Sequence, residues 1–274
     1  MPNKDIDLRA AINAISDVVQ NRPRPFREFD QIYMKTGDMV LQSELIAHWA
    51  NGKRLCFIGD GDAISICVAY LHKLGIFDYG PSLIVVYDFD ERICNAIRAF
   101  AGRYELGHLQ ARLYNCIDEF PDDGNFECFY TNPPWGASNK GRSVKLFVQR
   151  GMEAVGYKGS GVVVVADAQK CQCEWAGEVL VQTQRFALDS GFYIQKMAQG
   201  HQYHLDDDPE LQSCNLMVGA LPGVLPGNSL DDKDIVRDFY GHSKPLNVRY
   251  VRERKSIDYG KAHADEYELE LLEQ

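Results

Sequence analysis

The sequence predicts an α/β fold built around a doubly wound, mostly parallel β-sheet. From residue 53 to about residue 221, short apolar segments alternate with segments that have apolar residues at helical spacing. The short segments are apolar nearly throughout rather than at every second position, which is typical of parallel strands that are buried on both faces. A chain of 274 residues can form one large α/β domain with a smaller addition.

The first fifty residues are predicted to form a small helical preface to the sheet. Residues 4–20 have the apolar spacing of an amphipathic helix, and the proline-containing stretch 21–25 ends it. A second helix is expected at residues 39–50. We therefore expect a helical N-terminal segment over residues 1–50.

The predicted α/β core covers residues 51–226. Strands are expected at residues 54–58, 83–87, 110–115, 126–131, 161–166, 192–198 and 215–221, and helices at residues 63–74, 91–101, 143–155 and 175–190. The last two strands are joined without a clear helix, which indicates an antiparallel pair. Residues 227–274 are predicted to be a charged C-terminal extension, in which the acidic stretch 265–270 is expected to be solvated.

Composition and charge exclude several classes of function. The formal net charge is −10, with 39 acidic against 29 basic residues, whereas duplex DNA is held largely by basic residues, so we expect no nucleic-acid partner. No apolar run approaches the roughly 20 residues that cross a bilayer. The N-terminus has no signal-peptide pattern, so we expect a cytoplasmic protein without a membrane partner. The eight cysteines include no C-x-x-C pair, which favours reduced thiols.

The most informative motif is Asn132-Pro133-Pro134-Trp135, which follows an aromatic, β-prone segment. The two prolines remove two backbone donors and leave neighbouring carbonyl oxygens unpaired. The Asn132 amide oxygen and such a carbonyl can both accept hydrogen bonds from one amino group, and Trp135 can screen that group from water. Such a pocket suits an amine that is about to be alkylated. A rigid loop after a strand is the alternative that the tetrapeptide alone leaves open.

Acidic residues follow the first three strands of the predicted sheet, where an open α/β sheet binds its ligands. The first strand runs into Gly59-Asp60-Gly61-Asp62, whose glycines permit a sharp turn and whose carboxylates would repel a phosphate and attract a cation. Asp88 at the second strand is expected to bind ribose hydroxyls, with Asp90 as a competitor that could instead cap the next helix. Asp118 could meet an adenine amino group. With Asn132, these residues indicate a site for an adenosyl sulfonium compound.

A second cluster, His201, His204 and Asp206, lies between the last two predicted strands. Three interpretations stay open, in decreasing order of preference: an exposed loop, an acidic mouth for a polyamine, and a metal site. We expect no metal.

The arrangement resembles known families. A closing antiparallel pair on a Rossmann-like sheet is similar to the class I S-adenosylmethionine transferases, and N-P-P-[YFW] is shared by amino-methyltransferases. The combination of Arg27-Glu28-Phe29-Asp30-Gln31, the turn at 59–62 and Asn132–Trp135 resembles the branched-chain polyamine synthases, or N-bis(aminopropyl)spermidine synthases, over roughly residues 26–221. The motif of that family is Gly-Asp-Asp-Asp, and Gly61 replaces its middle aspartate here.

The resemblance implies transfer of an aminopropyl group from decarboxylated S-adenosylmethionine to a polyamine substrate. This donor carries an ammonium group and no carboxylate, which suits an acidic turn. We expect Asp60 to bind the donor and Asp62 to accept the proton of the attacking amine. Pro133, Trp135 and the His201 cluster are expected on the acceptor side. The alternative is an amino-methyltransferase that uses ordinary S-adenosylmethionine, and a homodimer is one option for the assembly.

Overall fold

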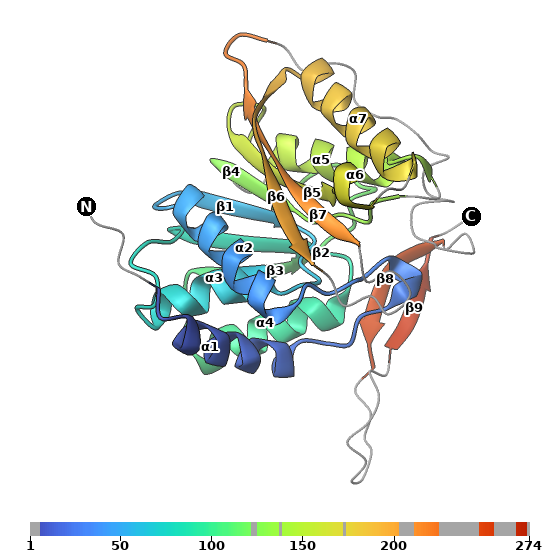
Figure 1. Ribbon diagram of the computed structural model, residues 1–274. Helices are drawn as coiled ribbons and strands as arrows, with labels where there is room; N and C mark the ends of the chain where they lie inside the picture. Colours follow the sequence, from blue (N-terminus) through green and yellow to red (C-terminus); the bar gives the residue numbers. More distant parts are fainter. Residues whose placement is uncertain are drawn as a thin grey trace.

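A seven-stranded β-sheet with helices on both faces forms the centre of the protein (Figure 1). The computed structural model describes residues 6–121, 125–136, 139–171, 174–202, 211–224, 247–254 and 267–272. The strand order is β3-β2-β1-β4-β5-β7-β6. The strands are β1 (Arg54–Ile58), β2 (Leu83–Asp88), β3 (Leu109–Leu113), β4 (Cys128–Thr131), β5 (Ser160–Ala166), β6 (Phe192–Gln202) and β7 (Gln212–Ala220).

The strand directions confirm the predicted fold class. Strands β1 to β5 are mutually parallel, whereas β7 runs antiparallel to β5 and β6 runs antiparallel to β7. The sheet order reverses between β1 and β4, because the chain builds outward to β3 before it returns to the other side of β1. In sheets of this kind, ligands bind beyond the carboxyl ends of the strands at such a reversal.

Two hydrophobic layers cover the faces of the sheet. Alternate residues of β1 show the division, since Leu55 and Phe57 belong to one core cluster and Cys56 and Ile58 to the other. The first layer contains α1 (Leu8–Asn21), α2 (Thr36–Trp49), α3 (Ile64–Lys73) and α4 (Glu91–Arg103). The second contains α5 (Arg142–Ala154) and α7 (Glu174–Asp189), and the four-residue helix α6 (Ala168–Cys171) precedes α7.

The two predicted N-terminal helices are present and belong to the first layer. Buried side chains of α1, among them Ile15 and Val18, lie in the same core cluster as the sheet residue Phe57. A short 3-10 helix, η1 (Arg27–Phe29), follows α1 and leads the chain across the carboxyl ends of the strands. The second helix begins at Thr36, three residues before its predicted start.

The prediction that residues 265–270 are solvated holds for the described glutamates but not for Tyr267 and Leu269. Strand β9 (Tyr267–Leu271) pairs antiparallel with β8 (Val248–Glu253) and forms a separate two-stranded sheet. In this strand, acidic residues alternate with apolar ones, so the acidic composition does not show that every second residue packs against the protein. Glu268 and Glu270 are exposed and bind Arg254 and Arg252, whereas the alternating Tyr267 and Leu269 are half-buried against the second core cluster.

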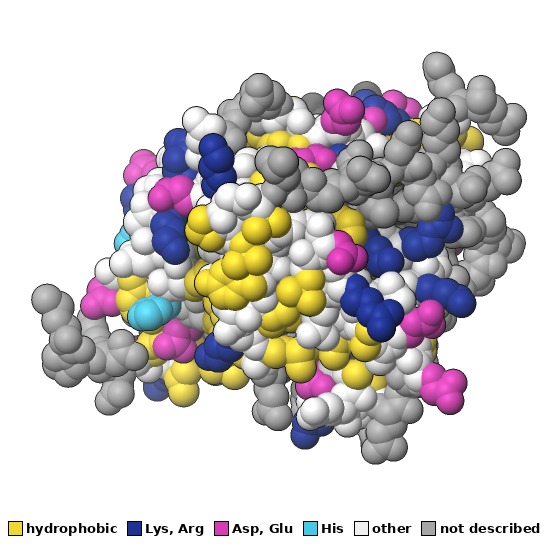
Figure 2. Space-filling model, turned by 90° about the horizontal axis from the view of Figure 1, so that it is seen from above, with side chains coloured by type: hydrophobic (Ala, Val, Ile, Leu, Met, Phe, Trp, Pro, Cys, Tyr) yellow, Lys and Arg dark blue, Asp and Glu magenta, His cyan; other side chains and the backbone are white. Residues whose placement is uncertain are grey.

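The described surface carries charges of both signs. On the face shown in Figure 2, basic and acidic side chains are interspersed around apolar patches, and no broad basic stripe crosses that face. Large exposed apolar side chains include Val181 and Leu188 of α7 and Tyr193 and Met197 of β6. Within the described residues, no helix has both the length and the apolar character that crossing a membrane requires, and no disulfide joins the cysteines.

Candidate active site

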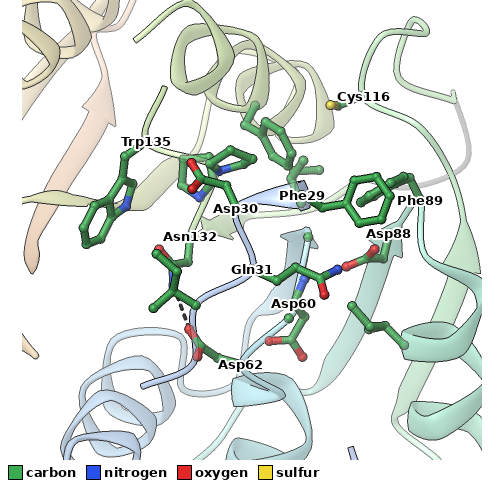
Figure 3. Close-up of a pocket in the computed structure, with 18 of the residues that line it drawn as sticks. Phe29, Asp30, Gln31, Asp60, Asp62, Asp88, Phe89, Cys116, Asn132 and Trp135 are labelled. Atoms are coloured by element: carbon green, nitrogen blue, oxygen red, sulfur yellow. Dashed lines mark hydrogen bonds between the residues drawn. The ribbon is translucent and has the colours of Figure 1, made fainter. Parts of the chain in front are cut away.

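A cavity of about 240 Å³ lies at the carboxyl ends of β1, β2 and β4 (Figure 3). Its position is where the sheet topology predicts a ligand. The segments that form its walls are the stretch after α1, the β1–α3 turn, the end of β2, the loop after β3 and the Asn-Pro-Pro-Trp loop after β4. Most of the predicted site residues line it, namely Gly59, Asp60, Gly61, Asp62, Asp88, Asn132, Pro133 and Trp135.

The β1–α3 turn is held against the end of β2. Gly59 adopts a φ of +75°, which favours glycine, and its amide donates to the Tyr87 carbonyl at 2.8 Å. The next amide, that of Asp60, donates to Asp88 Oδ2 at 2.9 Å. These two hydrogen bonds fix the acidic turn relative to Asp88.

Asp60 and Asp62 have different hydrogen-bond partners. Both oxygens of Asp60 accept hydrogen bonds from α3, one from the Ile64 amide at 2.9 Å and one from the Ser65 amide at 3.1 Å. Burial raises the pKa of Asp60 well above its ordinary value. Asp60 therefore caps the N-terminus of α3, and its contact with the ammonium of a donor stays a prediction.

Asp62 faces the Asn-Pro-Pro-Trp loop. Its Oδ1 accepts a hydrogen bond from the Met34 amide, and its Oδ2 accepts one from Asn132 Nδ2, both at 2.7 Å. The second bond is the dashed line in Figure 3. Burial raises the pKa of Asp62, although these two hydrogen bonds and the charge of Arg22 oppose the shift. The structure thus joins the two residues that the sequence assigned to the attacking amine.

Gly61 has room for a Cβ atom. A Cβ atom at this position would lie 3.5 Å from Tyr33 Cε1 and 4.0 Å from Gln31 Cγ, which are ordinary contact distances. The glycine is therefore not required by close packing. Its presence leaves Asp60 and Asp62 as the two carboxylates of the turn.

Asp88 lies at the end of β2 and is nearly fully buried. Its two oxygens accept hydrogen bonds from the amides of Asp60 and Asp90, both at 2.9 Å. A carboxylate has about four acceptor positions, so it can also accept from two hydroxyls. Burial and the nearby charge of Asp90 raise the pKa of Asp88 to about 7. Phe29 and Phe89 flank this part of the cavity (Figure 3).

Two predicted nucleoside ligands do not line the cavity. Asp90 caps α4 by accepting from the Arg92 amide at 3.0 Å, and its side chain forms a buried ion pair with the Arg92 guanidinium. Asp118 accepts from both terminal nitrogens of Arg249, at 2.8 and 2.6 Å. The cap that the sequence offered as the alternative for Asp90 is confirmed. The assignment of Asp118 to adenine is not supported, because its carboxylate binds the β8–β9 hairpin instead.

The Asn-Pro-Pro-Trp loop forms the wall of the cavity opposite Asp88 and Phe89. In Figure 3, Asn132 and Trp135 lie on one side of the cavity and Phe89 and Asp88 on the other, with Gln31 between them. The Trp135 indole nitrogen donates to the Val164 carbonyl at 3.2 Å, which fixes the ring against β5. The cavity therefore has two halves: one lies next to Asp88 and contains Phe29 and Phe89, and the other lies next to Asp62 and contains Asn132 and Trp135.

The stretch after α1 contributes wall residues to which sequence reasoning gave no role. Asp30, Gln31 and Tyr33 all line the cavity, and Asp30 has a left-handed φ of 58°. Gln31 is fixed by accepting from the Phe26 amide at 2.9 Å and donating to Asp90 at 3.2 Å. The motif at residues 27–31 was the available signal, but nothing in its residue types shows that the chain crosses the cavity there.

The histidine cluster is only partly covered by the structure. His201 belongs to β6, and His204 and Asp206 lie outside the described residues, so its three interpretations stay open. In the part of the chain that is described, no three His, Cys, Asp or Glu side chains come together as a potential metal site.

The fold and the site together define the class of the protein. A parallel sheet that is closed by an antiparallel β7 between β5 and β6, with acidic turns after β1 and β2, is the Rossmann-like sheet of the class I S-adenosylmethionine transferases. The family model of the branched-chain polyamine synthase A C-terminal domain matches residues 10–266. The chain therefore belongs to this family.

Individual relatives have low sequence identity to this chain. An uncharacterised protein of Methanocaldococcus jannaschii is 25% identical over 266 residues, which cover 96% of this chain and 61% of that protein. The N(4)-bis(aminopropyl)spermidine synthase of the same organism is 26% identical over 148 residues, which cover 53% of this chain and 39% of the enzyme. The matched region therefore spans less than two thirds of each of these relatives.

A solved structure has the same fold. The branched-chain polyamine synthase of Thermus thermophilus, in complex with N4-aminopropylspermidine and 5′-methylthioadenosine, matches with a TM-score of 0.64 and 21% identity. The match covers 83% of this chain and 70% of that one.

Proposed function

We propose that the protein transfers an aminopropyl group from decarboxylated S-adenosylmethionine to a polyamine nitrogen. The observation that carries the proposal is the hydrogen-bonded pair of Asp62 and Asn132, which faces a cavity with an aromatic, nucleoside-type half. Membership of the branched-chain polyamine synthase family supports it.

The nucleoside of the donor would occupy the half that contains Asp88. The Phe29 and Phe89 rings meet edge to face, with centroids 5.4 Å apart, and offer apolar surface to a purine. The ionised Asp88 carboxylate would accept hydrogen bonds from the two ribose hydroxyls. The Thermus relative was solved with 5′-methylthioadenosine, the nucleoside that remains when such a donor loses its aminopropyl group.

The polyamine would approach from the side of Asn132. Asn132 Nδ2 donates to Asp62, and the proposal gives the amide oxygen of Asn132 the role of accepting a hydrogen bond from the amine. The amine nitrogen attacks the methylene carbon next to the sulfonium, and the carbon–sulfur bond breaks with its electron pair going to sulfur. The proton of the attacking amine passes to Asp62. A carboxylate whose pKa is raised by burial is suited to this proton transfer.

The charges around the cavity favour the decarboxylated donor. The lining residues include four aspartates, Asp30, Asp60, Asp62 and Asp88, and one arginine, Arg27. Ordinary S-adenosylmethionine carries a carboxylate, which these aspartates would repel, whereas the decarboxylated donor presents only cationic groups at that end.

The second candidate function is amino-methyl transfer from ordinary S-adenosylmethionine, which the Asn132–Trp135 motif favours. Calorimetric titration with both donors distinguishes the two. We expect the decarboxylated donor to bind at least about tenfold more tightly, the effect of 1.4 kcal/mol of electrostatic preference. Tighter binding of ordinary S-adenosylmethionine would support methyl transfer instead.

Replacing Asn132 by alanine should lower turnover much more than donor affinity. The variant loses the amide that holds the accepting amine, while Asp88 and the aromatic wall are unchanged. We expect turnover to fall by about 10²-fold, the cost of a misplaced reactant. Single-turnover rates and donor titrations measure the two effects separately. A loss confined to donor binding would place Asn132 in the nucleoside half.

Donor affinity should depend on pH near neutrality. Asp88 has a pKa raised to about 7, and ribose hydroxyls bind its ionised form, so affinity should rise as the pH increases through 7 and then level off. Below pH 7, binding should release a proton, which calorimetry detects by comparing buffers of different ionisation enthalpy. Asp88→Asn should bind weakly with a flatter pH dependence. An equally steep dependence in that variant would assign the titration to another group.

A further inference from the structure

The β8–β9 hairpin contacts Phe89, which lines the nucleoside half, and two neighbouring segments, the stretch after α1 and helix α4. The Val251 amide donates to the Phe89 carbonyl at 3.2 Å, and the Tyr267 ring packs on Phe26 with centroids 4.4 Å apart. On α4, Asn95 donates to Glu253 at 2.6 Å. Figure 1 shows the hairpin beside the N-terminal segment, although the two are far apart in the sequence.

The hairpin makes its most specific contacts with the loop after β3. This loop lines the cavity through Tyr114 and Cys116. Asn115 is fully buried between them, and its Nδ2 donates to the Arg249 carbonyl at 2.6 Å. Its Oδ1 accepts from the Ile117 amide at 3.1 Å, so one side chain sets the shape of the loop and joins it to β8.

The ion pair of Arg249 and Asp118 also joins the hairpin to the loop after β3. It is bidentate and half-buried, which makes it geometrically specific. On the inner side, the loop is also held by α5, because Arg150 Nε donates to the Cys116 carbonyl at 2.8 Å. The loop after β3 is therefore held by two elements, the hairpin and α5.

We propose that the hairpin positions the β3 loop for nucleoside binding, with Arg249, Asp118 and Asn115 as positioning residues. The inference rests on the proposed function only in taking the ligand to be an adenosine-type nucleoside. A loop that is supported on both sides is ordered before the ligand arrives, so binding does not have to include the cost of ordering it.

Arg249→Met tests this proposal, with Arg254→Met as the matched control. Arg254 likewise forms an ion pair, with Glu268 of β9, but this pair is exposed and neither of its residues lines the cavity. Calorimetry with 5′-methylthioadenosine measures the affinity. We expect Arg249→Met to bind about tenfold more weakly, since it loses charge-assisted hydrogen bonds, while the control binds like the parent. Arg249→Lys keeps the charge without the bidentate geometry and should fall between them.

Turnover separates positioning from catalysis. At saturating donor, Arg249→Met should keep its turnover within about twofold, because the attacking amine and Asp62 lie in the other half of the cavity. Parental affinity in Arg249→Met, or an equal loss in Arg254→Met, would overturn the positioning role and leave the proposed function intact. A parent protein that binds no 5′-methylthioadenosine would overturn the nucleoside assignment itself.

Discussion

Asp62→Asn should lower turnover by about 10²–10⁴-fold while donor affinity stays nearly unchanged, the cost of removing a positioned proton acceptor. Asp62 lies beside Asn132 in the half of the cavity that is away from Asp88. The substitution preserves the shape of the side chain but places an amide where a carboxylate accepts two hydrogen bonds. Pre-steady-state rates at saturating donor measure the chemical step directly.

Asp60→Asn is the matched control for this prediction. Asp60 is an equally buried carboxylate of the same turn, but its oxygens face α3. We expect this variant to weaken donor binding and to retain most of its turnover at saturating donor. Parental rates in both variants would show that neither carboxylate accepts the proton.

Asp88→Ala should abolish detectable donor binding without unfolding the protein. The side chain is the only described carboxylate at the end of β2 that lines the cavity, and the ribose hydroxyls would lose their acceptor. Loss of hydrogen bonds to a buried charged group corresponds to about 10²-fold or more in affinity. Circular dichroism checks the fold and calorimetry measures the affinity.

Asp90→Ala is the comparison for that result. Asp90 is two residues away and equally buried, yet it caps α4 and binds Arg92 rather than lining the cavity. Its loss should lower thermal stability more than donor affinity. If instead Asp88→Ala binds the donor like the parent, the ribose contact is elsewhere.

The strand end residues illustrate what the sequence could predict. The alternation of apolar segments fixes where each strand ends, so Asp60, Asp62, Asp88 and Asn132 are correctly expected at one edge of the sheet. The hydrogen-bond partners of these residues cannot be predicted in the same way. Nothing local shows that Asp60 turns toward the α3 amides or that Asp62 turns toward Asn132, which is 70 residues away, because both depend on tertiary packing.

The two predictions that the structure does not support in full, on Asp118 and on the acidic stretch, share a cause. Asp118 has the residue type and the position of a nucleoside ligand, but its partner Arg249 is 131 residues away in the C-terminal extension. The same extension looks solvated because its strand alternates acidic and apolar residues over only five positions. Pairing between such short, distant strands leaves little trace in a single sequence, so the hairpin and its contacts emerged only from the structure.

The most direct test of aminopropyl transfer is mass spectrometry of the products formed from decarboxylated S-adenosylmethionine and spermidine. We expect the polyamine to gain the mass of one aminopropyl group, with one 5′-methylthioadenosine released for each transfer. Asp62→Asn provides the background rate. A polyamine that gains only a methyl group from ordinary S-adenosylmethionine, with no product from the decarboxylated donor, would contradict the proposed function.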